Sequence, residues 1–365
     1  MLVTAIEARP VRSLDQVRVE LAPGIVSVVG PNGVGKTNLV ESLYFALTGR
    51  SFRTSDRRDL IPFGASLARA EATVRDADGL ERRLLASVSR TEGRRHLLDG
   101  SPADPATLAR NRPPVAVFAP DRLSLVKGPP SERRAHLDGF LAARWPARGE
   151  LRKRYGQALA QRNALLSKLA GGFGSLSQLD VWDASLAAAA APLIAAREEA
   201  IAELSEPFAT TAAELGLEGG ASIEYAPRAS GSEEEIRLGL AERRDQDVRM
   251  GRSSWGPHLD EFKLATAGRS LRRYGSQGQQ RAALLALLFA EREALLLARR
   301  VTPLLLLDDV MSELDPGRRE RLVQRLGDGG QTLITAADQE SLPAPALASV
   351  VRMPPPAQQP SAAAA

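Results

Sequence analysis

The chain has 365 residues, of which 44% are hydrophobic, and its 48 lysines and arginines stand against 44 acidic residues for a formal net charge of +4. This length and apolar content allow a sizeable core, and we expect two lobes. The absence of cysteine excludes disulfides and thiolate chemistry and fits a reducing cytoplasm, while so small a net charge does not by itself predict binding to nucleic acid.

The N-terminal sequence has no long apolar run after a basic segment, so it does not predict a signal peptide. No stretch of the chain approaches the ~20 apolar residues that are needed to span a bilayer. We therefore expect a soluble protein of the cytoplasm with no membrane partner.

Residues 1–125 predict strands around one helix. Val17–Leu21 alternates apolar and polar side chains, the pattern of a half-buried strand. Ile25–Val29 is a continuous apolar run, typical of a buried strand that leads into a loop. Leucines at four-residue spacing predict a helix that begins at Lys36, and Gly49 can end it.

Two turn signals follow in the same segment. The sequence Asp76-Ala77-Asp78-Gly79 lies between the strand-like runs Ala68–Val74 and Leu80–Val88 and predicts a hairpin. Asp99-Gly100 marks a second turn, and Val115–Phe118 predicts a further short strand.

The character of the chain changes at Gly128-Pro129-Pro130. Residues 131–215 are rich in helix-forming residues, with apolar side chains at helical spacing. We expect this helical run to be broken at Gly171-Gly172, Pro192 and Pro207. The polar stretch Ala229–Glu235 predicts a loop, and 126–253 is interpreted as an inserted, compact helical lobe.

The alternation of strands and helices returns near Trp255. Leu304–Leu307 and Thr332–Thr335 predict buried strands, with an amphipathic helix at Arg318–Leu326 between them. We therefore expect the segments 1–125 and 254–353 to form one discontinuous domain, which the helical lobe interrupts. The low-complexity sequence of 354–365 predicts a disordered tail.

A complete P-loop lies between the second predicted strand and the first predicted helix. Gly30-Pro31-Asn32-Gly33-Val34-Gly35-Lys36-Thr37 fits the pattern G-x-x-x-x-G-K-[ST]. Its glycines allow tight turns that aim backbone N–H groups at a β-phosphate, Lys36 neutralises phosphate oxygens, and Thr37 offers a hydroxyl to Mg²⁺. With ATP and Mg²⁺ as the cofactors, the predicted nucleotide-binding residues are Gly30, Pro31, Asn32, Gly33, Val34, Gly35, Lys36, Thr37 and Asn38.

The predicted strand Leu304–Leu307 ends in two aspartates. An acidic residue at the end of a buried strand can lie beside the phosphates, so Asp308 is expected to hold Mg²⁺ together with Thr37. Asp309 follows directly and is the candidate general base or water-positioning group, which makes Asp309 and Lys36 the predicted catalytic residues.

The segment Ser276-Gln277-Gly278-Gln279-Gln280 precedes an apolar helix, Ala282–Leu288, and repeats the phosphate-binding chemistry of a helix N-terminus. It resembles the signature motif of ABC-type ATPases, whose usual form is Ser-Gly-Gly-Gln, and Gln277 departs from that form. Ser312-Glu313-Leu314-Asp315 resembles the D-loop of the same family. The resemblance implies that four residues complete the nucleotide site of a second protomer: Ser276, Gly278, Gln279 and Asp315.

The P-loop and the signature lie far apart in this chain. Transporter heads keep these motifs much closer, and SMC-like heads separate them by a long coiled coil, for which the insert is too short. Several strings are similar to those of the RecF family, which has an SMC-like head without the long arm. They are Gly49-Arg50-Ser51-Phe52-Arg53-Thr54, Phe118-Ala119-Pro120-Asp121, Gly128-Pro129-Pro130 with Arg133-Arg134 and Leu137-Asp138, Trp255-Gly256-Pro257-His258-Leu259-Asp260 and Tyr274-Gly275 before the signature.

This resemblance implies an α/β fold: an ABC-type, SMC-like ATPase head, with a mixed sheet that carries the P-loop and an antiparallel β region, and the helical lobe as a short arm. It also implies an ATP-dependent DNA-binding protein of recombinational repair. Two heads would dimerise around ATP on single-strand gaps or duplex–single-strand junctions, and weak, DNA-stimulated hydrolysis would release them. The implied partners are RecR and RecO, and indirectly RecA and SSB, at the nucleoid.

Two other classes of ATPase fit parts of the chain. A transporter subunit is disfavoured by the long span and because no histidine follows Thr332–Thr335, where transporters carry their switch histidine. A small-molecule kinase or GTPase is disfavoured because there is no Asn-Lys-x-Asp motif, and a kinase has no use for the signature. A purely structural protein is the weakest alternative, given the placement of Asp309.

Several residues keep two interpretations. Asp121 is either the equivalent of the ABC Q-loop or the N-cap of a helix. His258 is interpreted as structural rather than catalytic. The arginine-rich segments Arg50–Arg58 and Arg148–Arg154 are candidates for DNA contacts, although a basic cluster is more often a solvated face.

Overall fold

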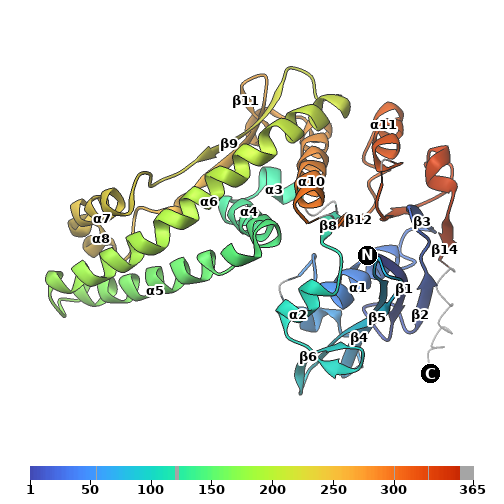
Figure 1. Ribbon diagram of the computed structural model, residues 1–365, viewed down its shortest axis with the longest axis horizontal. Helices are drawn as coiled ribbons and strands as arrows, with labels where there is room; N and C mark the ends of the chain where they lie inside the picture. The colour runs from blue at the N-terminus through green and yellow to red at the C-terminus, as the bar shows by residue number, and fades with distance from the viewer. Residues whose placement is uncertain (55, 120–122, 300, 328, 354–365) are drawn as a thin grey trace, which may run out of the picture. The chain divides into compact units, whose positions relative to one another are not determined.

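The computed structural model describes residues 1–54, 56–119, 123–299, 301–327 and 329–353. The chain divides into two compact units, the first formed by residues 1–122 with 295–365 and the second by residues 123–294. Figure 1 labels many of the helices and strands of both units. The tail predicted at 354–365 lies outside the described residues.

The first unit contains a parallel sheet of five strands in the order β14-β3-β13-β12-β8. Its strands are β3 (Ile25–Val29), β8 (Val115–Phe118), β12 (Leu304–Leu307), β13 (Thr332–Ala336) and β14 (Val350–Arg352). Every residue of β3, β12 and β13 is buried, as expected for strands covered on both faces. The register pairs Val29 with Ala336 and Leu307 with Ile334, so the loops that follow these three strands begin at the same edge.

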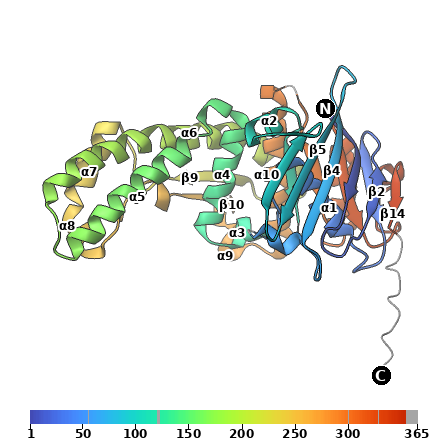
Figure 2. The same cartoon turned by 90° about the horizontal axis from the view of Figure 1, so that it is seen from below.

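The second sheet of this unit is antiparallel, with six strands in the order β2-β1-β4-β5-β6-β7. Its strands are β1 (Leu2–Ala8), β2 (Val17–Glu20), β4 (Leu67–Arg75), β5 (Glu81–Ser89), β6 (Gly93–Leu98) and β7 (Ser101–Pro102). β4 and β5 lie side by side in Figure 2 and confirm the predicted hairpin. Asp99 has a φ of 50° between β6 and β7, which confirms the second turn.

Helix α1 (Lys36–Thr48) packs against β1, β4 and β5, and its apolar side chains belong to the core of the first unit. Gly49 ends the helix as predicted, since it adopts a left-handed conformation with a φ of 66° and donates its N–H to the Phe45 carbonyl. The other helices of this unit are η1 (Arg57–Leu60), α2 (Pro105–Arg110), α11 (Pro316–Gly327) and η6 (Ala344–Leu347).

The second unit is built on two long neighbouring helices, α5 (Leu151–Ala170) and α6 (Leu179–Glu214), which form a helical hairpin (Figure 1). A small antiparallel sheet has the order β11-β10-β9, with β9 (Ala221–Ala226), β10 (Glu261–Thr266) and β11 (Arg269–Ser270). The remaining helices are α3 (Ser124–Lys127), α4 (Pro130–Arg144), η3 (Pro146–Arg148), η4 (Leu176–Gln178), α7 (Glu233–Glu242), α8 (Arg244–Met250), η5 (Pro257–Leu259) and α9 (Leu271–Tyr274). Helix α10 (Gln277–Arg299) begins in this unit, and its residues from Leu295 onward are assigned to the first.

Two expected breaks in the helical run are wrong. The run does stop after Ala170, but α6 continues for 36 residues through Pro192 and Pro207. A proline inside a helix frees the carbonyl four residues earlier, which for Pro192 is that of the exposed Ala188, where water can donate to it. The opposite face of α6 is buried against α5, α7 and β9, and this packing keeps the helix continuous.

The loop expected at Ala229–Glu235 is shorter than predicted. Ser232 and Glu235 form a capping box, in which each side chain accepts a hydrogen bond from the other residue's backbone N–H, and α7 begins at Glu233.

The expectation that no segment has the length and composition of a membrane span is also wrong. Leu176–Glu214 has both, largely because of its many alanines. However, α6 buries Asp183 and Arg197, and both side chains form ion pairs with other helices of the same unit. A core helix of a folded domain accounts for these features.

The boundaries of the two units differ from those expected. Residues 254–294 belong to the second unit rather than to the domain that holds the P-loop. The reason is that β10 pairs along its whole length with β9, from Glu261 opposite Ala226 to Thr266 opposite Ala221. Strand pairing between such distant segments carries no local sequence signal.

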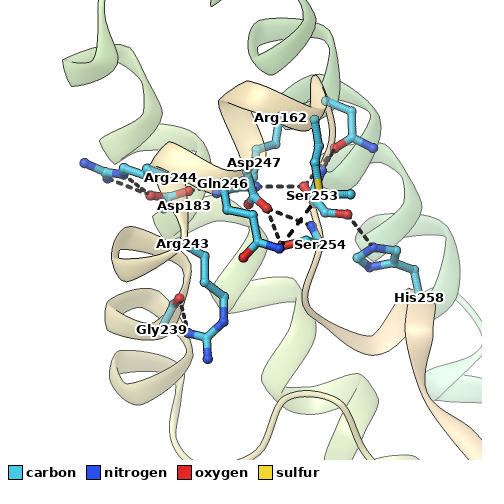
Figure 3. A network of polar contacts seen from close by, with 12 residues as sticks. Arg162, Asp183, Gly239, Arg243, Arg244, Gln246, Asp247, Ser253, Ser254 and His258 are labelled. Atoms are coloured by element: carbon cyan, nitrogen blue, oxygen red, sulfur yellow. Dashed lines mark hydrogen bonds and ion pairs between the residues drawn. The ribbon is translucent and has the colours of Figure 1, made fainter. Parts of the chain in front are cut away.

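Buried ion pairs connect the helices of the second unit (Figure 3). Arg162 of α5 is fully buried and donates to Asp183 of α6 at 2.7 Å, to Asp247 of α8 at 2.6 Å and to the Ser253 hydroxyl at 2.8 Å. A similar cluster surrounds Arg197 of α6, which forms two 3.0 Å bonds to Asp138 of α4 and one of 2.9 Å to Asp260. These contacts fix α4, α5, α6 and α8 relative to one another within this unit.

We predict that the substitution Asp247→Ala destabilises the second unit by about 3–5 kcal/mol, because it leaves the buried Arg162 guanidinium poorly compensated. The matched control is Asp180→Ala, which removes a carboxylate that is 64% exposed and pairs with Arg244, and should cost ~1 kcal/mol or less. All three tryptophans, Trp145, Trp182 and Trp255, lie in this unit, so urea unfolding followed by tryptophan fluorescence reports on it. Equal losses in the two variants would contradict the prediction.

Candidate nucleotide-binding site

The P-loop connects β3 to α1, as predicted. Gly33 and Gly35 have φ values of 84° and 103°, a region that favours glycine. A Cβ atom on Gly35 would lie 2.7 Å from the Leu14 side chain, so this position also lacks the space for one. Gly30 is different, because only space restricts it: its Cβ would lie 3.1 Å from Val34 and 3.2 Å from Met353. Pro31, Asn32 and Gly33 form the exposed side of the loop.

Lys36 lies at the first position of α1 and is 8% exposed. Its Nζ atom donates to the carbonyl oxygens of Gly30 at 2.6 Å and Pro31 at 3.0 Å. The ammonium group is therefore held over the loop, next to the N–H groups at the N-terminal end of the helix. A positive charge and a helix N-terminus at one place form an anion-binding site.

Asp308 follows β12 and connects three segments of the first unit. Its Oδ1 atom accepts a hydrogen bond from Thr37 of α1 at 3.0 Å and another from Thr335 of β13 at 2.8 Å. Burial raises the pKa of the Asp308 carboxyl above its usual range, whereas the hydrogen bonds from Thr335 and Thr37 act in the opposite direction. The sequence predicted Asp308 and Thr37 as neighbours, and the structure places them together.

Thr335 is a site residue that sequence reasoning missed. Its hydroxyl donates to Asp308 and also accepts the backbone N–H of Asp309 at 2.8 Å, so one side chain orients both aspartates. The only available signal was its position at the end of a predicted buried strand. That strand pairs with β12 in the sheet, and the pairing was not predictable from sequence.

Asp309 has an unusual backbone. Its φ of 50° is uncommon for a residue other than glycine, and such a conformation costs of order 1 kcal/mol or more. The Thr335 hydroxyl on its N–H and the Ser312 hydroxyl on its carbonyl hold it there. The carboxylate itself has no partner among the described residues, which leaves it available next to Asp308.

A second missed feature is a fully buried acid on the P-loop helix. Glu41 accepts two hydrogen bonds of 2.9 Å from Arg12 and one of 2.5 Å from Ser51. Arg53 reaches both Glu41, at 3.4 Å, and the Asn38 amide oxygen, at 3.2 Å. This network connects Asn38, a predicted nucleotide-binding residue, to the segment that follows α1. Glu41 lies among the apolar residues of α1, and nothing in the sequence indicated that Arg12 and Ser51 would be its partners.

The signature segment belongs to the second unit and starts α10. Ser276 and Gln279 form reciprocal bonds: the Ser276 hydroxyl accepts the Gln279 N–H at 3.2 Å, and Gln279 accepts the Ser276 N–H at 2.9 Å. Gly278 lies in the first turn, and Gln280 is buried and donates to the Leu271 carbonyl. Ser276 and Gln277 are exposed. A serine at an exposed helix N-terminus is thus present as predicted.

Asp315 has a structural role in the first unit. It accepts the N–H of Arg318 at 3.0 Å and so caps α11, and this hydrogen bond lowers the pKa of its carboxyl. The side chain stays exposed, so the cap leaves one face of the carboxylate accessible. Asp121, the other residue with two interpretations, lies outside the described residues.

His258 makes the contacts of a structural residue. Its Nδ1 atom lies 2.7 Å from the Tyr155 hydroxyl and its Nε2 atom 3.2 Å from the Ser253 carbonyl oxygen. Burial lowers its pKa, which favours the neutral ring. It therefore connects α5 to the segment before β10.

The donor set at Asp308 suits one kind of metal ion. No group of three or more His, Cys, Asp or Glu side chains is arranged to hold a metal in the part of the chain that the structure describes. Mg²⁺ does not need such a group, because it takes one or two protein oxygens and completes its shell with phosphate and water. The Asp308 carboxylate and the Thr37 hydroxyl provide those two oxygens.

These features define a class of protein: a P-loop ATPase head with a helical insertion and an ABC-like signature. The family model described as RecF/RecN/SMC N terminal domain matches residues 2–353. A protein of Streptomyces avermitilis named DNA replication and repair protein RecF is 39% identical over 364 residues, which cover 94% of this chain and 95% of that protein. A protein of the same name from Heliobacterium modesticaldum is 35% identical, with 89% of each chain covered.

Solved structures agree with this result. A structure described as the recombination mediator protein RecF-ATP in the RecFOR pathway has a TM-score of 0.84 and 27% identity, and covers 94% of this chain and 93% of its own. An SMC head bound to the C-winged helix domain of ScpA has a TM-score of 0.57 at 16% identity and shows the fold alone. The chain belongs to the RecF family. The predicted α/β, SMC-like head and the resemblance to RecF are confirmed, with the parallel and antiparallel strands in separate sheets.

We predict that Thr335→Val weakens Mg²⁺-dependent nucleotide binding roughly five- to tenfold, because the isosteric change removes one net hydrogen bond of about 1 kcal/mol from Asp308 and frees the Asp309 N–H. Thr332→Val is the matched control, since Thr332 lies on the same strand with a hydroxyl that lacks a hydrogen-bond partner. Titration with a fluorescent ATP analogue, with and without Mg²⁺, measures the effect. Equal affinities in both variants would contradict it.

Proposed function

We propose that this protein is an ATP-dependent DNA-binding protein of recombinational repair, whose two heads are held together by ATP. The observation that carries the proposal is the placement of Asp308, which accepts hydrogen bonds from the P-loop helix and from β13 at one sheet edge. That arrangement makes a phosphate and Mg²⁺ site at which binding and hydrolysis can be coupled.

Each residue at this edge has a proposed role. Lys36 and the N–H groups at the start of α1 bind the β- and γ-phosphates, and Thr37 and Asp308 hold Mg²⁺, which neutralises phosphate charge when bound. Asp309 orients the attacking water or accepts its proton, which its strained backbone and unpaired carboxylate support.

We further propose that a second copy of the chain completes the site. Ser276 and Gln277 are exposed at the N-terminal end of α10, where free N–H groups and a hydroxyl favour an anion. Contributing Ser276, Gly278 and Gln279 to the partner's nucleotide, together with Asp315, gives a symmetric interface with two nucleotides between two protomers. ATP then shifts an association equilibrium, and slow hydrolysis reverses it.

The names of the relatives support a proposal for the setting of this activity. The relatives are named DNA replication and repair proteins, and a related structure is described in the RecFOR pathway. We therefore propose that the protein acts on gapped or junction DNA in the bacterial cytoplasm, with RecR and RecO as partners, and that it supports the loading of RecA on SSB-coated single strands. Hydrolysis is weak and stimulated by DNA, because it times release.

Two substitutions separate nucleotide binding from dimerisation. Lys36→Met removes the ammonium that binds phosphate, and we expect at least a hundredfold loss of ATP affinity, since charged hydrogen bonds contribute about 1.5–3 kcal/mol each. Ser276→Arg places a bulky cation at the signature, and we expect ATP affinity within about twofold of wild type but no dimer.

Light scattering with and without ATP, in the presence and absence of gapped duplex DNA, measures both effects. The wild-type mass should double with ATP, and neither variant should dimerise. A Ser276→Arg protein that still dimerised with ATP would refute the shared site and leave the nucleotide assignment intact.

We expect Asp309→Asn to bind ATP and dimerise but to hydrolyse at least a hundredfold more slowly, because the amide cannot accept a proton. The matched control is Asp338→Asn, an exposed acid whose side chain accepts the Ser341 N–H. Phosphate release with and without DNA, together with light scattering, checks the prediction. An unchanged hydrolysis rate in Asp309→Asn would remove Asp309 from the chemistry.

A further inference from the structure

Four cationic or titratable side chains meet in the first unit at the end of the P-loop helix. Arg50 follows Gly49, the residue that ends α1, and Arg57 begins η1, which packs against β5. Arg94 and His96 lie two positions apart on β6, so they face the same side of the sheet. The His96 ring lies against Gly49 so closely that a Cβ atom has no room there. Three separate elements thus contribute to one basic cluster.

This cluster lacks the partners that other arginines of the chain have. Within the described residues no carboxylate pairs with Arg50, Arg57 or Arg94. The Arg57 Nε and His96 Nδ1 atoms are both buried and have no hydrogen-bond partner. Buried polar groups are satisfied in the great majority of cases, so two unpaired nitrogens in one cluster need an explanation.

The charges of the cluster also oppose one another. Partial burial lowers the pKa of Arg57, and the positive charges of Arg94 and Arg50 lower it further. Burial likewise lowers the pKa of His96, with Arg94 and Arg57 adding to the effect. The C-terminal end of α1 offers only about half a negative elementary charge. It cannot balance three guanidinium groups, so the cluster keeps uncompensated positive charge.

We propose that the cluster of Arg50, Arg57, Arg94 and His96 binds the phosphodiester backbone of DNA. The exposed guanidinium groups of Arg50 and Arg94 can donate to phosphate oxygens, and the phosphate charge relieves the mutual repulsion of the arginines. This inference rests on the proposed DNA-binding function and assigns a contact site for it.

A phosphodiester fits the cluster better than a free phosphate ion. Arg50 and Arg94 are exposed while Arg57 and His96 are half-buried, so the cluster opens to solvent instead of enclosing a small anion. An open array of cations suits a long polyanion, which releases counterions at each contact. The two sources of phosphate are distinguishable with a DNA duplex and inorganic phosphate as separate probes.

Histidine resonances provide a direct readout. The chain has three histidines, and His136 and His258 both lie in the second unit, with Glu291 and Tyr155 as partners. We expect a gapped duplex to shift the His96 Cε1–H resonance and to raise the His96 pKa by about one unit or more, because a phosphate beside the ring favours its charged form. Inorganic phosphate, at a molar excess of roughly 10-fold, is the control for a free ion and should leave both the His96 resonance and the His96 pKa unchanged.

The chain offers a matched pair of variants on one strand. Arg94 has no ion pair, whereas Arg95 points to the opposite face of β6 and pairs with Glu92 at 2.9 Å. We expect Arg94→Gln to weaken binding of a gapped duplex roughly five- to tenfold at 0.1 M salt and to reduce the slope of log K against log salt by about 1. Arg95→Gln should stay within about twofold of wild type.

Thermal stability separates binding from a structural role. Arg94→Gln relieves repulsion, so its Tm should equal or exceed that of wild type, as expected for a binding site. Nucleotide affinity without DNA should be unchanged in both variants. A lowered Tm with unchanged DNA affinity would overturn the inference in favour of a structural cluster, and so would equal DNA affinities of the two variants. Wild-type protein that binds no DNA would instead refute the proposed function.

Discussion

The hydrogen bonds to the Asp308 carboxylate are the constraint on which the rest of the head depends. They join Thr37, at the start of α1, to Asp308, which lies 271 positions further along the chain, and to Thr335 of β13. The sheet brings these distant residues together. Only the parallel register of β3, β13 and β12 brings these residues to one edge. A shift of one residue in any of these strands would turn the aspartate away from the P-loop.

The same constraint explains why the head contains buried charge. The Mg²⁺ site proposed at Asp308 needs an ionised carboxylate, and burial of that group opposes ionisation. The two threonine hydroxyls offset part of this cost, and Glu41 is held in a similar way by Arg12 and Ser51 beneath the helix. The P-loop helix is therefore fixed by polar contacts at its first turn and near its middle, as well as by its apolar face.

The sequence was informative where local chemistry decides the structure. Ile25–Val29, Leu304–Leu307 and the end of α1 at Gly49 were predictable, because a buried strand or a glycine cap has a local pattern. The pairing of β9 with β10 and the partners of Glu41 were not, since they depend on contacts between distant segments. Pro192 misled for the same reason: packing on one face of α6 outweighs its local effect on the helix.

Satisfied and unsatisfied charge clusters have different consequences in this chain. Arg162 is fully enclosed between two carboxylates, so even its unpaired Nη2 atom is out of reach of any ligand, and the cluster serves only to hold helices together. Arg57 has no carboxylate, and exposed Arg94 leaves the cluster open to solvent. A buried arginine that is paired with carboxylates holds its neighbours in place. An accessible cluster of arginines without carboxylates keeps a mutual repulsion that an external anion can lower. Because this second cluster adjoins the end of α1, an anion bound there acts on the same helix whose other end carries Lys36.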